Sequence, residues 1–197
     1  MTKKVIQLIL ASNSPRRKQL LKQTRLKFKS VHTRFDEQYS AHLKDLEIVE
    51  HIVYQKANSL INLSSDQNLI LVADTIVWDG HNCLGKPKNE KQACRMLEQL
   101  SDRTHHVITG VGFLLNKKID FLHQSTEVKF KKLEKDEILY YVQNHCPFDK
   151  AGSYGIQEWI GLIGIDWIKG SYTNVVGLPL SQVHEKLKEY ALKYNFD

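Results

Sequence analysis

Apolar residues occur in this chain in blocks whose spacing predicts strands and helices in turn. The run at residues 5–11 predicts a buried strand, because it is short, rich in branched side chains and ends at polar turn formers. Residues 69–78 form the strongest predicted strand. Between these two runs, residues 32–40 are polar and loop-like, and apolar positions at helical spacing then predict a long helix over residues 41–63.

The helical and strand periodicities also predict the elements in the rest of the chain. Helices are predicted over residues 14–24, 90–100, 135–145 and 179–194. Strands are predicted over residues 26–31, 104–115, 119–133 and 160–168, with a tight connection at residues 170–179. Asp79-Gly80 predicts the turn of a short hairpin that follows the strand at residues 69–78.

The junction between the first strand and the first helix combines good capping residues with three adjacent cations. Ser14 is a favourable N-cap, and Pro15 is a favourable first helical residue. Residues 16–18, Arg-Arg-Lys, then lie at the positive end of the helix dipole, where each costs about 0.3–1 kcal/mol without a counter-charge. An anion held by backbone N–H groups, the Ser12 and Ser14 hydroxyls and a guanidinium would reverse that sign. We favour this anion site over the alternative of a solvated basic helix end.

Two charged residues interrupt otherwise apolar patterns. Asp74 lies inside the apolar run at residues 69–78, where an unpaired carboxylate would be costly, so it needs a partner or a function. The adjacent Thr75 and the nearby Gly85-Lys86-Pro87 favour a functional site over an ion-paired structural aspartate. Lys56 occupies a place on the apolar stripe of the predicted long helix, and it either reaches the surface along its stem or points into a polar cleft.

The composition suits one globular domain over residues 1–197, with 42% hydrophobic and 25% charged residues. A net charge of +6 is compatible with nucleic acid, a membrane surface or a small polyanion, but no run of Lys and Arg exceeds three, which disfavours a nucleic-acid tail. The N-terminal apolar run is too short to span a membrane. Cys83, Cys94 and Cys146 are widely spaced, which argues against a disulfide framework or zinc site and predicts a cytoplasmic protein.

Six short motifs resemble, in order, those of the Maf family, and together they cover residues from about 5 to 190. They are Ala11-Ser12-Asn13-Ser14-Pro15-Arg16-Arg17, Ala73-Asp74-Thr75, Gly85-Lys86-Pro87, Thr104-His105, the Ala-Gly-Ser-Tyr-Gly-Ile-Gln stretch at residues 151–157, and Gly170-Ser171-Tyr172 through Val176-Gly177-Leu178-Pro179. The resemblance implies a nucleoside triphosphate pyrophosphatase that cleaves between the α and β phosphates with a divalent cation, Mg²⁺ or Mn²⁺, and is commonly a homodimer. It also implies an α/β fold related to the inosine triphosphate pyrophosphatases, with a mixed twisted sheet, flanking helices and two lobes around a cleft.

The resemblance also assigns roles to individual residues. Asp74 matches the family's catalytic proton acceptor. The residues that match its phosphate-binding turn are Ser12, Arg16 and Arg17. Further polar residues of the family's site are matched by Glu37, Lys56 and Lys86, and positions linked to substrate choice are matched by Arg17, Thr75 and Gln157. The ligands of the metal are left unassigned. Asp102 stands where the family usually has glycine, so its loop is open to another conformation, and His105 is a candidate support behind the site.

The stretch at residues 154–157 resembles the branch of the family that acts on dTTP and UTP. A glutamine amide offers one acceptor and two donors, so Gln157 could satisfy both O4 and N3 of uracil or thymine, or it could instead cap the glycine turn. Gly152 and Gly155 permit close approach of a flat ligand, although an ordinary turn has the same residues. The alternatives are the branch that acts on 7-methyl-GTP and modified nucleotides, and a non-catalytic nucleotide- or nucleic-acid-binding regulator of cell division, which gives Asp74 no role.

Overall fold

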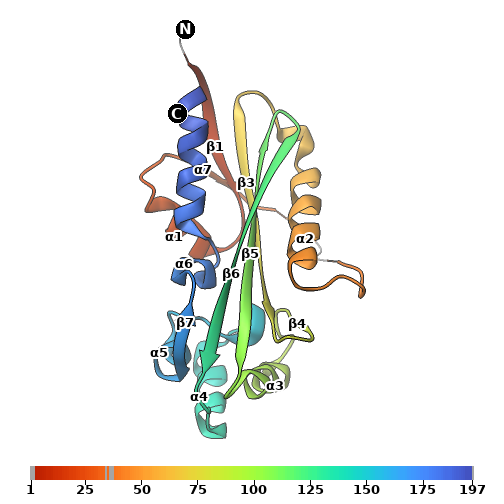
Figure 1. Ribbon diagram of the computed structural model, residues 1–197, viewed down its shortest axis with the longest axis vertical. Coiled ribbons are helices and arrows are strands. Elements are labelled where there is room, and N and C mark those ends of the chain that lie inside the picture. Colours follow the sequence, from red (N-terminus) through yellow and green to blue (C-terminus); the bar gives the residue numbers. More distant parts are fainter. Residues whose placement is uncertain (1–2, 34, 36–37, 197) are drawn as a thin grey trace. The chain divides into compact units, whose positions relative to one another are not determined.

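The computed structural model describes residues 3–33, 35 and 38–196, and the chain divides into two compact units (Figure 1). Unit 1 comprises Met1–Asp74, Thr109–Gln124 and Gly177–Asp197, and unit 2 comprises Thr75–Ile108 and Ser125–Val176. The three long strands β3 (Asn68–Trp78), β5 (Thr104–Leu115) and β6 (Lys118–Phe130) each contribute residues to both units.

The strands form one mixed sheet with the main order β2-β1-β3-β5-β6-β7, while β4 pairs with β3 and β8 pairs with β1. The shorter strands are β1 (Lys4–Ala11), β2 (Lys29–Val31), β4 (Cys83–Leu84), β7 (Ile165–Lys169) and β8 (Tyr194–Phe196). Strand β1 runs parallel to β2, β3 and β8, whereas β4 and β7 are antiparallel to their partners. The predicted mixed sheet with flanking helices is confirmed.

Unit 1 covers its strands with helices on both faces (Figure 1). Its helices are α1 (Pro15–Lys22), α2 (Asp45–Ser59) and α7 (Leu180–Lys193). One face of β3 places Leu69, Leu71 and Ala73 in a buried cluster that includes Val183 and Leu187 of α7. Because side chains alternate along a strand, residues 70, 72 and 74 point to the opposite face, where α2 packs. This alternation decides which helix Asp74 meets.

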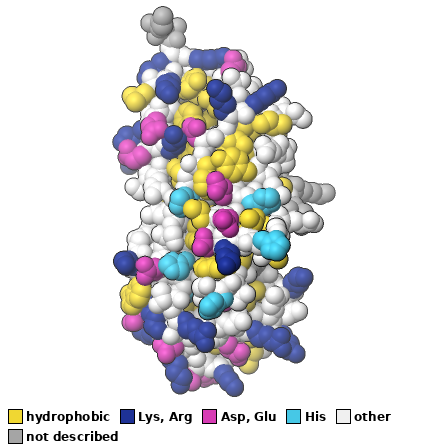
Figure 2. Space-filling view, turned by 45° about the vertical axis from the view of Figure 1, so that its right-hand side comes forward, with side chains coloured by type: hydrophobic (Ala, Val, Ile, Leu, Met, Phe, Trp, Pro, Cys, Tyr) yellow, Lys and Arg dark blue, Asp and Glu magenta, His cyan; other side chains and the backbone are white. Residues whose placement is uncertain are grey.

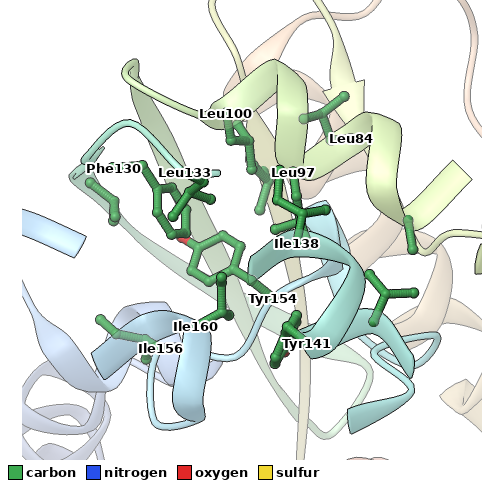
Figure 3. Packing of buried hydrophobic residues seen from close by; sticks show 14 of the residues in the cluster. Leu84, Leu97, Leu100, Phe130, Leu133, Ile138, Tyr141, Tyr154, Ile156 and Ile160 are labelled. Atoms are coloured by element: carbon green, nitrogen blue, oxygen red, sulfur yellow. The ribbon is translucent and has the colours of Figure 1, made fainter. Parts of the chain in front are cut away.

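Unit 2 has a second apolar core, built around α3 (Glu90–Leu100), α4 (Lys135–His145), α5 (Trp159–Gly164) and α6 (Tyr172–Val176). Figure 3 shows Tyr154 inside this core, with Phe130 and Leu133 near its ring and Tyr141 on α4. The rings of Phe130 and Tyr154 meet edge to face with their centroids 5.0 Å apart, a favourable geometry for aromatic pairs. The residues that follow Tyr154 in the chain are therefore attached to a rigid core.

The predicted strand at residues 160–168 is wrong in its first half, because residues 159–164 form α5 and only Ile165–Lys169 is extended. A short apolar run cannot distinguish a strand from a buried helix by periodicity. In the helix that forms, a Cβ at Gly161 would lie 2.3 Å from the carbonyl oxygen of Ile156, so only glycine fits at this position. The predicted connection at residues 170–179 also contains a helix, α6.

Several predicted boundaries were too wide, and two short elements were missed. The helix predicted over residues 41–63 is α2 from Asp45 to Ser59, followed by the 3-10 turn Ile61–Leu63, and the strand predicted over residues 26–31 is only Lys29–Val31. The 3-10 turn Ala151–Ser153 and strand β8 were not predicted. Strand β8 depends on pairing with β1, which lies almost the whole chain away in sequence.

The surface agrees with the scattered charge pattern of the sequence. On the face shown in Figure 2, Lys and Arg side chains are interspersed with Asp and Glu. Within the described part of the chain, no helix combines the length and the apolar character needed to cross a membrane.

Candidate active site

The turn between β1 and α1 has the capping geometry that the sequence predicted. Helix α1 begins at Pro15, and the Ser14 hydroxyl accepts a hydrogen bond from the backbone N–H of Arg17 at 3.4 Å. The Ser12 hydroxyl accepts from the N–H of Ser14 at 3.2 Å. Both hydroxyls therefore point toward the first turn of the helix, beside the side chains of Arg16 and Arg17, which are partly buried. The predicted N-cap and first helical residue are confirmed.

The Arg17 side chain is fixed by a distant part of unit 1. Its Nε donates to the carbonyl oxygen of Gly177 at 2.8 Å. Gly177 has a φ of +127°, a backbone conformation that favours glycine, and Leu178 beside it is fully buried. The last sequence motif therefore orients one arginine of the first motif.

Asn13 connects this turn to the loop after β2, a role that no sequence pattern indicated. Its side-chain amide donates to the carbonyl oxygen of Thr33 at 2.6 Å and accepts from the Thr33 N–H at 3.1 Å. The same oxygen lies 3.1 Å from Nδ1 of His32. Asn13 thus anchors the segment that leads to Phe35, and the predicted site residue Glu37 lies outside the described residues.

Lys56 and Asp74 form an ion pair in unit 1, with 2.5 Å between Nζ and Oδ1. Only 14% of the lysine side chain and 8% of the aspartate side chain are exposed. Lys56 lies one turn after Val53 on α2, and Asp74 lies two residues after Val72 on β3. Val53 and Val72 lie on either side of Gly112, because a Cβ built on that glycine would lie 3.0 Å from a methyl group of each valine. Helical and strand periodicity therefore bring the two charges together on one interface.

This ion pair and the Ser12 turn lie near the carboxyl end of β1, beside the middle of the longer parallel strand β3. Leu10 of β1 pairs with Leu71 of β3, so the end of β1 at Ala11 is level with the residues just before Asp74. Ligands in open α/β sheets bind beyond the carboxyl ends of parallel strands. The Lys56 ammonium also lies 5.8 Å from the centre of the Phe35 ring, a cation–π contact that the sequence did not reveal.

In unit 2, two further motifs are joined through their backbones. The N–H of Gly152 donates to the carbonyl oxygen of Gly85 at 3.2 Å, next to Lys86, whose side chain is exposed. Gly152 has a φ of +66°, and a Cβ there would lie 3.0 Å from a methyl group of Val77. Internal packing thus explains this glycine. Gln157 is exposed on a turn a few residues further along the same segment.

His105 lies in the core of unit 2 and supports that segment from behind. Its Nε2 lies 2.7 Å from the Tyr154 hydroxyl, and its ring stacks on Phe130. Burial lowers the pKa of His105 to about 3, with a smaller contribution from His106. Burial also raises the pKa of Tyr154. The neutral imidazole is therefore a packing and positioning group, not a proton carrier at neutral pH.

Asp102, where the family usually has glycine, has a φ of +54°, in the left-handed region that favours glycine. Lys129 donates to both its carbonyl oxygen, at 2.6 Å, and its Oδ1, at 2.9 Å. These bonds hold the pKa of Asp102 below its usual value. The loop thus accepts an aspartate through a compensating lysine.

Among the described residues, no three His, Cys, Asp or Glu side chains are grouped so that they could hold a metal ion by themselves. Asp74 is the buried carboxylate of the candidate site. Mg²⁺ usually takes one or two protein carboxylates and completes its shell with phosphates and water, so this donor set fits a cation brought in with a phosphorylated substrate.

The family model described as "Maf-like protein" matches residues 7–190. The chain belongs to the Maf family. The match runs through both units and all six motifs, as the sequence analysis predicted.

Similar proteins cover nearly the whole chain. The chain is 44% identical over 184 residues to the dTTP/UTP pyrophosphatase of Flavobacterium johnsoniae, covering 93% of this chain and 95% of that protein. It is 46% identical over 183 residues to the dTTP/UTP pyrophosphatase of Phocaeicola vulgatus, covering 92% and 95%. The solved structure of the Staphylococcus aureus Ham1 protein shares the fold, with a TM-score of 0.55 at 11% identity, over 93% of this chain and 99% of that one.

Proposed function

We propose that this member of the Maf family is a nucleoside triphosphate pyrophosphatase that hydrolyses dTTP and UTP to the nucleoside monophosphate and pyrophosphate. The observation that carries the proposal is the buried Lys56–Asp74 pair on β3, close to the carboxyl end of the parallel strand β1, where the basic N-terminus of α1 begins. The substrate class is supported by the names of relatives that are 42–46% identical to this chain.

Phosphate binding is assigned to the first turn and to two lysines. Ser12 and Ser14 lie in the turn before α1, and Arg16 and Arg17 lie in its first helical turn, at the positive end of the helix where an anion is favoured. Lys56 and Lys86 supply further positive charge. Opening a phosphoanhydride redistributes negative charge over the phosphates, so fixed cations stabilise the transition state more than the ground state.

Asp74 is proposed as the proton acceptor. A water oxygen forms a bond to the α phosphorus, the bond from that phosphorus to the bridging oxygen breaks, and pyrophosphate leaves with the electron pair. The water proton passes to the Asp74 carboxylate, which Lys56 holds in place at 2.5 Å. Glu37 is retained as a second candidate acid of the site.

We also propose a requirement for Mg²⁺ or Mn²⁺, which Asp74 would hold together with the substrate phosphates. Such a cation, when bound, neutralises phosphate charge and polarises the phosphorus that is attacked.

Base recognition is assigned to Gln157, with Thr75 completing the pocket or setting its width. The amide of Gln157 can meet the O4 acceptor and the N3 donor of a uracil or thymine ring at once. Cytosine reverses both groups, so an unpaired amide should disfavour CTP by about 5- to 150-fold. We further propose that residues 1–197 act as one cytoplasmic domain in a homodimer. The cytoplasmic assignment agrees with Cys83, Cys94 and Cys146, which form no disulfide within the described part of the chain.

Pyrophosphate release from dTTP, UTP, CTP, GTP and 7-methyl-GTP tests the proposal, measured as kcat/KM with and without Mg²⁺. We expect turnover that needs the cation and is fastest with dTTP and UTP. Binding of nucleotides without pyrophosphate release would overturn the enzyme assignment. Preference for GTP, 7-methyl-GTP or CTP would overturn the base assignment and leave the reaction class in place.

A further inference from the structure

Gln157 lies on a four-residue turn in unit 2, residues 155–158, whose first and last residues are both held by hydrogen bonds. The N–H of Glu158 donates to the carbonyl oxygen of Gly155 at 3.0 Å, so Ile156 and Gln157 are the two central residues. Ile156 is 6% exposed and packs into the core of unit 2 (Figure 3), whereas Gln157 is exposed. The turn therefore anchors one side chain inward and presents the next one outward.

The side chain of Glu158 folds back over the start of the same turn. A Cβ at Gly155 would lie only 2.7 Å from the carboxyl carbon of Glu158, so a larger residue there would push the carboxylate away. The φ of Gly155 is not positive, which means that the glycine is needed for space and not for backbone conformation. Because Glu158 turns back in this way, it does not cap α5 with its side chain.

Tyr141 on α4 links the two ends of the turn. Its buried hydroxyl accepts a hydrogen bond from the N–H of Gly155 at 3.1 Å and donates a short one to Oε2 of Glu158. Burial raises the pKa of Tyr141, and the bond to Glu158 raises it further. The hydroxyl thus keeps the proton that it donates across the whole working range of an enzyme.

Lys150 completes the arrangement. Its Nζ lies 3.0 Å from Oε1 of Glu158 and 2.7 Å from Oδ1 of Asp149, and 9% of its side chain is exposed. Both carboxylate oxygens of Glu158 therefore have a partner, one from α4 and one from the start of the segment that carries Gln157. Tyr141 and Lys150 are buried, and the Glu158 side chain is 22% exposed. A polar network with buried, paired members rigidifies its surroundings.

We propose that Tyr141, Glu158 and Lys150 are positioning residues that clamp the turn at residues 155–158 and so fix Gln157 for discrimination between pyrimidine bases. The inference rests on the proposed reading of the base by Gln157. None of the three side chains needs to touch the substrate. Loosening the clamp lets the amide sample more orientations, which weakens recognition of UTP and leaves the water-activating pair of unit 1 unaltered.

The test compares Tyr141→Phe with Tyr190→Phe, which removes a phenol–carboxylate hydrogen bond of the same kind in unit 1, where the Tyr190 hydroxyl donates to Asp120 at 2.8 Å. For each protein, kcat and KM are measured with UTP and CTP, together with thermal unfolding. We expect Tyr141→Phe to lower the UTP-to-CTP ratio of kcat/KM by about five- to tenfold, through KM for UTP, with kcat at saturating UTP within about twofold of wild type. Tyr190→Phe is expected to keep the wild-type ratio.

One further variant separates failure of the clamp from failure of the base reading. Gln157→Ala should lower the UTP-to-CTP ratio of kcat/KM at least as much as Tyr141→Phe does. A wild-type ratio in Gln157→Ala would overturn the base reading and the clamp together, whereas a wild-type ratio in Tyr141→Phe alone would overturn only the clamp.

If Tyr141→Phe does not fold, the pair Glu158→Ala and Glu158→Gln decides the question. Glutamine keeps an acceptor for the Tyr141 hydroxyl and alanine does not. We expect Glu158→Gln to retain most of the discrimination that Glu158→Ala loses. Equal ratios in the two variants would contradict a positioning role.

Discussion

Asp74→Asn removes one charge of the buried pair while keeping the shape of the side chain. Removing one partner of a buried ion pair generally costs about 3–5 kcal/mol. Here the asparagine oxygen can still accept from Lys56, and 14% of the lysine side chain is exposed, so we expect a smaller loss of about 1–3 kcal/mol. For a chain of 197 residues, each kcal/mol corresponds to about 2–4 °C in the melting temperature, so the variant should still fold.

The effect on turnover should be much larger than the effect on stability. Loss of a general base typically costs about 10²–10⁴ in rate, and loss of a cation ligand adds to this. We therefore expect kcat for dTTP and UTP to fall by at least about 10²-fold while nucleotide binding remains measurable. Pyrophosphate release measures turnover, calorimetry measures nucleotide affinity, and thermal unfolding measures stability.

Asp66→Asn is the matched control, because it makes the same chemical change in an exposed ion pair with Lys4 in unit 1. Exposed pairs contribute about 0–1 kcal/mol, so neither turnover nor melting should change appreciably. Lys56→Met combined with Asp74→Leu gives a second check, since an apolar pair should recover stability and remain inactive. A folded Asp74→Asn protein with turnover within tenfold of wild type would refute the assignment and make Glu37 the next candidate.

Three further results are expected. Arg16→Ala should lower kcat/KM by about tenfold or more, whereas Lys18→Ala, an exposed cation in the same helical turn, should change it little; equal effects would support the solvated-helix alternative. Lys86→Ala should also lower kcat/KM in a protein with wild-type melting, and a wild-type rate would remove Lys86 from the site. His105, with a folded pKa of about 3 against 6.5 unfolded, stabilises the fold above pH 6.5, and this stability is lost as the pH falls toward 3. Urea unfolding at pH 7 and pH 5 should therefore show that wild type loses about 2 kcal/mol more than His105→Gln, which can still bond to Tyr154 but does not titrate; parallel losses would contradict this.

The sequence by itself determined the parts of this protein that depend on local chemistry. The β1 strand, the Ser14 cap and the start of α1 at Pro15 follow from a few adjacent residues, and the structure has each of them as predicted. The apolar run around Asp74 also predicted that this carboxylate is buried in a strand. A buried carboxylate is costly without a partner, so the sequence further predicted that Asp74 has a partner or a function. Each family motif is a short contiguous stretch, so the motifs and the fold class that they imply could also be recognised from the sequence.

Only the tertiary structure decided which distant groups meet. Nothing local indicates that Lys56 ends 2.5 Å from Asp74 or that Arg17 is held by the carbonyl of Gly177. Nor could periodicity show that residues 159–164 are helical, since a short apolar run fits a strand and a buried helix equally well. Hydrogen bonds and close packing between segments far apart in sequence depend on the folded path of the chain, so they become visible only when both partners are in place.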